Sequence, residues 1–416
     1  MKIGEIDYFN HSSKPKCVFV DNKQLPLVCI DFWFKAGSAF EEIDKNGTAH
    51  FLEHMIFKGS NKIMPGEFDQ KIEYLGGISN ASTGYDDAHY YVLTPVENFK
   101  ESLALLTNIV LSPSIDINEF EKEKSVVIDE IKQQNDQPDE KLFNYFLSRV
   151  WKNNNYGKTI LGTEKDVESL KISDLEKFHK SFYNKKNFSI AIAGNLTKKT
   201  FEEFYENNFS CLDKNENYQI KNNNELISIS RIGREEIYFN NIQFSRIFIA
   251  WNIPNLNNQR INIGFEILAS ILSVGRNSRL VKALKEEKNL VQSIYVDVNC
   301  GEFGGLLIIE GCCDEIYLKN VEEEINLIIQ EVISCKNLTI KELRKAINII
   351  KSNYVFNLET STQLTSFFGN ELLWDRKNSL EDLNNHLEYW NNLNNFKEIL
   401  NYLLRDKFTL VVSTTK

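Results

Sequence analysis

Residues 47–59 read GTAHFLEHMIFKG, and this stretch decides how the rest of the chain is interpreted. The apolar spacing predicts a helix with Thr48 as N-cap and Gly59 as the stop. His50 and His54 are four residues apart, so they project from one helix face and can chelate a single metal ion. Glu53 directly precedes the second histidine, which is the inverted HxxEH order. The alternative interpretation is a helix with two ordinary imidazoles.

A second segment offers the third ligand that a catalytic zinc ion needs besides an open position for water. The helix predicted at 117–134 is rich in acids, most of which fit a solvated face. Glu130 differs because it follows the apolar run 126–128 and precedes Ile131, so we expect it to point inward. Glu123 lies two turns earlier on the same side and is expected to support the site.

The remaining pattern falls into two similar series of elements. The first series contains predicted strands at 27–36, 79–95 (two strands about residues 84–86) and 188–193, with helices at 68–75, 97–110, 117–134 and 173–181. The second contains strands at 236–253, 304–311 and 408–412, with helices at 261–273, 318–334, 340–356 and 380–392. Apolar periodicity weakens between them. We therefore predict an α+β protein with domains at 1–215 and 236–416, joined by a linker at 216–235.

Composition restricts the class of protein. The chain has 416 residues, of which 42% are hydrophobic and 25% charged, as in globular proteins of more than one domain. A net charge of -10 argues against nucleic acid or an anionic membrane as partner. No apolar run reaches the roughly 18 residues of a membrane span, and the start does not resemble a secretory signal, so we expect a cytoplasmic protein. The seven cysteines are interpreted as free thiols.

Together, residues 47–59 and 123–131 resemble the metal helix and the second-glutamate helix of the pitrilysin or insulinase family of zinc peptidases, which includes the mitochondrial processing peptidases. The resemblance implies one zinc ion per chain, held by His50, His54 and Glu130. It implies Glu53 as the catalytic general base and Glu123 as the supporting acid. Residues 80–83 resemble the family's edge strand, so Asn80, Ala81 and Ser82 are expected to hold a peptide substrate by backbone hydrogen bonds.

The same resemblance covers the second half, where Ser278-Arg279-Leu280 is similar to a recurring family stretch. It implies two homologous domains, each a mostly antiparallel sheet with helices on one face, forming one jaw of a clam-like dimer. The second domain is expected to lack metal ligands. Members with a self-sufficient site carry there an arginine and, seven residues on, a tyrosine that bind the substrate carbonyl. Here Lys285 and Gln292 stand at those positions, and Tyr295, three residues further, would face the other side of a strand.

We therefore expect a zinc-dependent endopeptidase subunit that hydrolyses short or unfolded peptides inside a dimeric chamber. A homologous, metal-free partner would supply the arginine-tyrosine pair. A homodimeric processing peptidase for one precursor is the alternative within the enzyme class, and a non-catalytic structural subunit is the alternative outside it. His89 could be a further ligand but reads as an ordinary strand residue, and His11, His179 and His386 receive no role.

Overall fold

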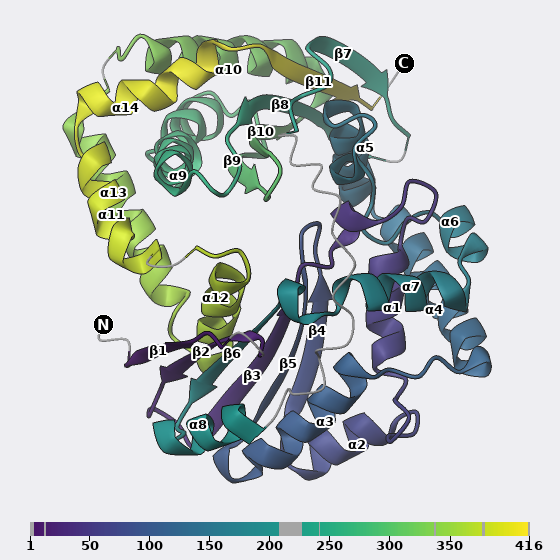
Figure 1. Cartoon of the computed structure of the whole chain (residues 1–416). Coiled ribbons are helices and arrows are strands. Elements are labelled where there is room, and N and C mark those ends of the chain that lie inside the picture. The colour runs from purple at the N-terminus through teal and green to yellow at the C-terminus, as the bar shows by residue number, and fades with distance from the viewer. Residues whose placement is uncertain are drawn as a thin grey trace. The chain divides into compact units, whose positions relative to one another are not determined.

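The computed structural model describes residues 4–11, 14–207, 227–240, 242–336, 338–376 and 379–414. The chain forms two compact units, each built on one sheet (Figure 1). The first contains Met1–Asn135, Lys158–Lys221 and Val355–Lys377. The second contains Asp136–Gly157, Asn222–Tyr354 and Asn378–Lys416. Among the described residues, no helix has the length and apolar character that crossing a bilayer requires.

The sheet of the first unit has six strands in the order β1-β2-β6-β3-β5-β4. Their bounds are β1 Ile6–Phe9, β2 Lys16–Asp21, β3 Leu27–Phe34, β4 Ile78–Thr83, β5 Ala88–Pro95 and β6 Phe188–Gly194. Only β2 and β6 run parallel. Alternate residues of β3, Ile30, Phe32 and Phe34, point into the hydrophobic core. That core lies between the sheet and the helices on this face.

The helices of the first unit connect the strands and cover this core. They are α1 Thr48–Ile56, α2 Glu67–Tyr74, α3 Phe99–Leu111, α4 Ile117–Asn135, α6 Glu164–Ser169, α7 Ile172–Phe182 and α8 Lys198–Asn207. Helix α3 packs on β5 and α8 on β2, while α1 lies between α4, α7 and the edge strand β4. The first unit therefore places α1 and α4 beside one open edge of its sheet.

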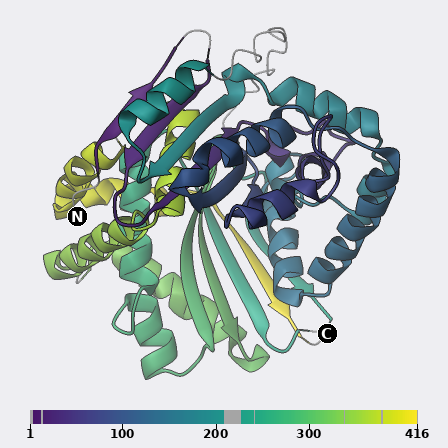
Figure 2. The same cartoon turned by 90° about the horizontal axis from the view of Figure 1, so that it is seen from below.

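The sheet of the second unit repeats this pattern without a counterpart of β1 (Figure 2). Its order is β7-β11-β8-β10-β9, with bounds Gly233–Tyr238, Lys407–Ser413, Ser245–Ile253, Gly305–Cys313 and Ser293–Cys300 in that order. Only β7 and β11 are parallel, as only β2 and β6 are in the first sheet. Its helices include α9 Gln259–Ser273, α10 Leu318–Ile333, α11 Ile340–Phe356, α13 Ser379–Trp390 and α14 Leu393–Leu400. The predicted α+β class with two mostly antiparallel, similar halves is confirmed.

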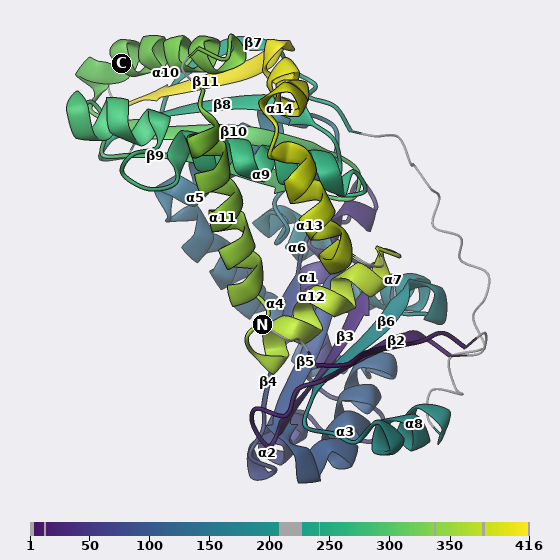
Figure 3. The ribbon, with the colours of Figure 1, turned by 90° about the vertical axis from the view of Figure 1, so that its left-hand side faces the viewer.

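Each sheet also carries a helix on its other face, which the prediction of helices on one face missed. Helix α12, Ser361–Leu373, packs on β6, β3 and β2 within the first unit (Figure 3). The packing is so close that a Cβ on Gly369 would lie 2.4 Å from the Trp33 ring. Helix α5, Pro138–Val150, belongs to the second unit, where Phe146 stacks on Phe248 at 5.0 Å.

The predicted domain boundaries agree only in part with the two units of the structure. All strands of the first sheet end before residue 215, and those of the second begin at Gly233. Gly233–Glu235, placed in the predicted linker 216–235, instead form the start of strand β7, and residues 208–226 lie outside the described residues. Because α5 and α12 each join the sheet of the other half, no single cut in the chain separates the two units.

Candidate metal centre

Helix α1 presents two of the predicted ligands because its apolar residues fix its orientation. Phe51, Leu52 and Met55 are fully buried in the core of the first unit. The N-cap is Gly47, with φ 85°, and not Thr48 as predicted. A Cβ at residue 47 would lie 2.4 Å from the Leu161 carbonyl oxygen, so only glycine fits there.

The three predicted ligands converge. The Nε2 atoms of His54 and His50 lie 3.5 and 3.8 Å from Glu130 Oε2, which reaches them from α4. These distances are too long for hydrogen bonds, but two ligands bound to one tetrahedral zinc at about 2.0–2.1 Å are roughly 3.3–3.5 Å apart. His50, His54 and Glu130 form the one such group of histidine, cysteine and acidic ligand atoms found among the described residues. This donor set suits zinc.

Glu123 fixes the ring of His54. Its Oε1 lies 2.9 Å from His54 Nδ1, and its Oε2 lies 2.7 Å from Lys58 Nζ. With Nδ1 donating to the carboxylate, Nε2 keeps its lone pair for the site beside Glu130. Burial acts to raise the pKa of Glu123, but the hydrogen bonds from His54 and Lys58 outweigh it and lower that pKa. Sequence reasoning gave Lys58 no role, although a basic residue four positions after His54, just beyond the end of α1, is a usable signal.

His50 is suited to bind a metal as a neutral ring. It is 8% exposed, and burial, followed by the charge of His54, lowers its pKa to about 4. Its Nδ1 is buried without a hydrogen-bond partner among the described residues. A neutral imidazole is the form that coordinates a metal ion, so the site requires little proton displacement at His50 near neutral pH.

Glu53 lies beside this group and is held by a residue of the edge strand. Its carboxylate accepts a hydrogen bond from the Thr83 hydroxyl. Burial raises the pKa of Glu53, while the Thr83 hydrogen bond and the charges of His54 and His89 oppose that rise. A carboxylate with a raised pKa beside a group of metal-ligand atoms is a candidate general base. Thr83 was predicted only as part of the edge strand 80–83, and no sequence pattern relates it to residue 53.

The predicted substrate residues Asn80, Ala81 and Ser82 lie in β4, which ends the sheet and pairs only with β5. Exposure alternates along this strand, with Asn80 and Ser82 exposed. The Ala81 N–H donates to the Asn80 side-chain oxygen at 2.9 Å, which occupies an edge donor in the free chain. An extended peptide that replaced this contact would add a strand to the sheet.

The predicted carbonyl-binding positions lie in the second unit. Lys285 is exposed in a π-helical segment, Val281–Glu287, and Gln292 is exposed just before β9. Ile294 is buried and Tyr295 is 61% exposed, so Tyr295 faces away from the core side of that strand. Arg279 is held by Glu342 through bonds of 2.9 and 3.1 Å, which assigns it to packing.

The other histidines stay outside the metal group. His89 Nδ1 lies 3.0 Å from Asp31 Oδ1, and its ring stacks on Trp33 at 4.1 Å. His179 Nε2 lies 2.9 Å from the Val110 carbonyl oxygen. Both are bound within the first unit.

Comparison with known proteins shows similarity to peptidase families. Residues 16–164 match the family described as Insulinase (Peptidase family M16), and residues 169–350 match Peptidase M16 inactive domain. An uncharacterized zinc protease of Bacillus subtilis, YmxG, is 28% identical over 95% of this chain and 93% of its own length. The mouse mitochondrial-processing peptidase subunit beta is 22% identical over 85% of this chain and 73% of its own. A protease from Helicobacter pylori has the same fold, with a TM-score of 0.86, 22% identity and coverage of 99% of this chain and 100% of that one.

Proposed function

Because the chain belongs to the insulinase family of metallopeptidases, we propose that it is a zinc-dependent endopeptidase that uses one zinc ion per chain. The observation that carries this proposal is the convergence of His50, His54 and Glu130, with Glu53 beside them. Zinc bound there would supply Lewis-acid polarisation of the scissile carbonyl and of the attacking water. Side chains of this chain carry out the proton transfers and hold the ligands in place.

Glu53 acts as the general base in this proposal. It accepts a proton from the attacking water as the carbon–oxygen bond forms, and it then delivers that proton to the leaving amine as the peptide bond breaks. The Thr83 hydroxyl orients the carboxylate, and its hydrogen bond favours the ionised form of Glu53 against the effect of burial, which raises the pKa. Glu123 and Lys58 hold His54 in the ligating tautomer.

Strand β4 supplies the substrate-binding edge. A peptide lying extended along Asn80, Ala81 and Ser82 would bind by main-chain hydrogen bonds, which are independent of side-chain identity. Such binding requires a segment without its own secondary structure, so short or unfolded peptides are the substrate class that we propose. Thr83 ends the same strand and contacts Glu53, so the bound main chain would run past the base.

We further propose that a homologous, metal-free subunit completes the enzyme inside a dimeric chamber. Support comes from Lys285 and Gln292, which replace the expected arginine and tyrosine, and from Arg279, which is bound to Glu342. A homodimeric processing peptidase is the second candidate, because some relatives are named mitochondrial-processing peptidases. A structural, non-catalytic subunit is disfavoured because the full set of ligands and the base are present. A cytoplasmic location stays a prediction.

Peptidase assays of the zinc-loaded chain test the proposal. The assay compares the chain alone with the chain plus a homologue that lacks HxxEH and carries the arginine-tyrosine pair. We expect activity with the partner and a loss of about 10²–10⁴-fold in Glu53→Gln, with zinc still bound. Full activity of the chain alone would favour the homodimer. Unchanged activity in Glu53→Gln would remove Glu53 as base.

A further inference from the structure

The N-terminus of the ligand helix α1 needs a hydrogen-bond acceptor that its own cap cannot provide. The first N–H groups of a helix have no partner within the helix, and an N-cap side chain normally accepts one of them. Here the cap is Gly47, and the Leu161 carbonyl leaves no room for a side chain at that position. The donors of the first turn must therefore be satisfied from elsewhere.

Glu41 satisfies two of them at once. Its Oε2 accepts the Gly47 N–H at 3.0 Å, and its Oε1 accepts the Ala49 N–H at 2.8 Å. Glu41 is 6% exposed, so water does not compete for these donors. Ala49 immediately precedes His50 in the chain. The buried carboxylate of Glu41 thus fixes the first turn of α1, which carries the proposed zinc ligand His50.

The loop that carries Glu41 is itself fixed to the turn between β4 and β5. The Ser38 N–H donates to the Gly84 carbonyl at 3.0 Å, and the Ala39 N–H donates to the Tyr85 carbonyl at 2.7 Å. Thr83, which holds the base Glu53, directly precedes that turn. The same turn therefore sets the position of the base through Thr83 and that of the ligand helix through the loop.

We propose that Glu41 is a positioning residue of the metal centre, which holds the start of α1 so that His50 meets Glu130 at ligand distance. This inference rests on the proposed zinc site, and it adds a residue to which sequence reasoning gave no role. A carboxylate is required because both oxygens accept an N–H, whereas a carboxamide offers one acceptor and places an NH₂ group against the second donor. Burial raises the pKa of Glu41, and the hydrogen bonds from the Ala49 and Gly47 N–H groups, which favour the ionised carboxylate, oppose that rise.

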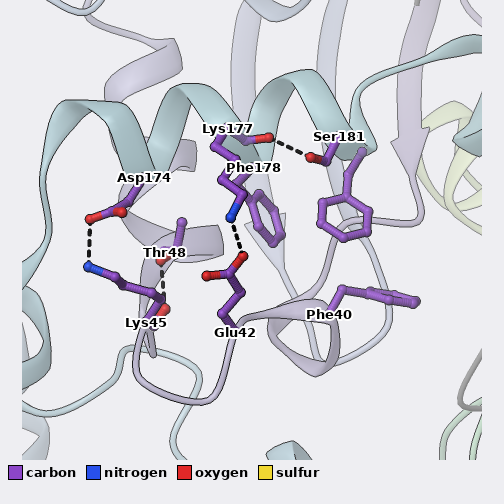
Figure 4. Close-up of a pocket in the computed structure, with 9 residues that line it drawn as sticks. Phe40, Glu42, Lys45, Thr48, Asp174, Lys177, Phe178 and Ser181 are labelled. Atoms are coloured by element: carbon purple, nitrogen blue, oxygen red, sulfur yellow. Dashed lines mark hydrogen bonds and ion pairs between the residues drawn. The ribbon is translucent and has the colours of Figure 1, made fainter. Parts of the chain in front are cut away.

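The adjacent Glu42 provides a matched control. It lies on the same loop, but its carboxylate pairs with Lys177 of α7 at 2.5 Å (Figure 4). Both partners are more than half exposed, so the pair contributes little to stability. Figure 4 also shows Lys45 paired with Asp174, a contact that involves neither substituted side chain.

The test compares wild type, Glu41→Gln and Glu42→Gln by zinc competition, by the visible spectrum of the cobalt-substituted chain and by kcat and KM. For Glu41→Gln we expect zinc binding weakened by about 10–100-fold, an altered cobalt spectrum and a fall in kcat with KM little changed, while Glu42→Gln matches wild type. If Glu41→Gln does not fold, Glu41→Asp replaces it, with the same expected direction.

Two results would overturn the inference. One is a Glu41→Gln chain with wild-type zinc affinity and cobalt spectrum, even if its melting temperature falls, because Glu41 would then only stabilise the helix. The other is equal loss in Glu42→Gln. A wild-type chain that binds no zinc would instead overturn the proposed function, and this inference with it.

Discussion

The substitution Glu123→Gln tests whether the carboxylate of Glu123 supports the metal ligand His54 or only lies beside it. The wild-type carboxylate accepts hydrogen bonds from His54 Nδ1 at 2.9 Å and from Lys58 Nζ at 2.7 Å. Glutamine has nearly the same size, but its one oxygen can serve only one of these donors. If the oxygen turns to Lys58, the NH₂ group faces His54 and favours the tautomer whose Nε2 carries the proton. That tautomer cannot ligate zinc through Nε2.

The expected magnitude follows from these two contacts. A hydrogen bond to a charged group contributes about 1.5–3 kcal/mol, and removing a partner of a metal ligand typically weakens metal binding by about 10–100-fold. That range corresponds to roughly 1.4–2.7 kcal/mol. Because glutamine keeps one of the two bonds, we expect zinc affinity to fall by about tenfold to fiftyfold in Glu123→Gln.

Competition with a chromophoric chelator at neutral pH measures this affinity. Glu121→Gln is the control, because Glu121 lies on the same helix and its side chain is 61% exposed. Its Oε1 lies 3.9 Å from Lys124 Nζ. The zinc affinity of this variant should equal that of wild type. The reasoning that His54 depends on Glu123 would be refuted if Glu123→Gln bound zinc within about twofold of the affinity of wild type and of Glu121→Gln. This comparison requires that the circular dichroism of Glu123→Gln be unchanged.

Three further outcomes are expected. Thr83→Val removes the hydrogen bond that stabilises ionised Glu53, so the pKa of Glu53 rises and the acid limb of the kcat/KM profile moves to higher pH; an unmoved limb contradicts the assignment. In the metal-free chain, burial acts to lower the pKa of His54, but its hydrogen bond to Glu123 and the nearby carboxylates outweigh burial and raise it. Zinc must displace that proton, so zinc affinity measured by calorimetry should fall as pH decreases through the raised pKa, with proton release; a pH-independent affinity would contradict this. Phe51→Ala, which removes a fully buried ring stacked on Phe120, should lower the free energy of unfolding in urea by about 3–5 kcal/mol, and a loss under about 1 kcal/mol would contradict the packing.

Local periodicity was sufficient for most elements of the fold. The alternation of β5 and the apolar spacing of α10 and α11 predict those elements to within a few residues, because each signal is contained in the element itself. Periodicity did not predict the helices α5, α6, α8, α12 and α14 or the strands β1 and β2. Proline is favoured at the first turn of a helix, and Pro138, which begins α5, was a usable signal for that helix. The capping box of Thr360 and Gln363 was a usable signal for α12.

The site residues likewise differ in whether the sequence signal for them lies within one element. His50, Glu53 and His54 share one helix, so their spacing alone predicts a shared face, and the seven-residue interval from Glu123 to Glu130 does the same for α4. The contacts of Glu41 and Thr83 could not be predicted in this way. Thr83 and Glu41 reach α1 through the sheet turn and a loop, and such contacts depend on tertiary packing that leaves no periodic trace in the sequence.

Zinc stoichiometry of the purified chain, measured by plasma mass spectrometry after equilibration with zinc and gel filtration, tests the central claim most directly. The claim predicts one zinc ion per chain in wild type. Glu130→Ala removes the ligand that α4 supplies, so this variant should lose most of its bound zinc while the circular dichroism of the chain stays unchanged. A zinc-free wild type, or a Glu130→Ala chain that retains a full zinc ion at wild-type affinity, would contradict it.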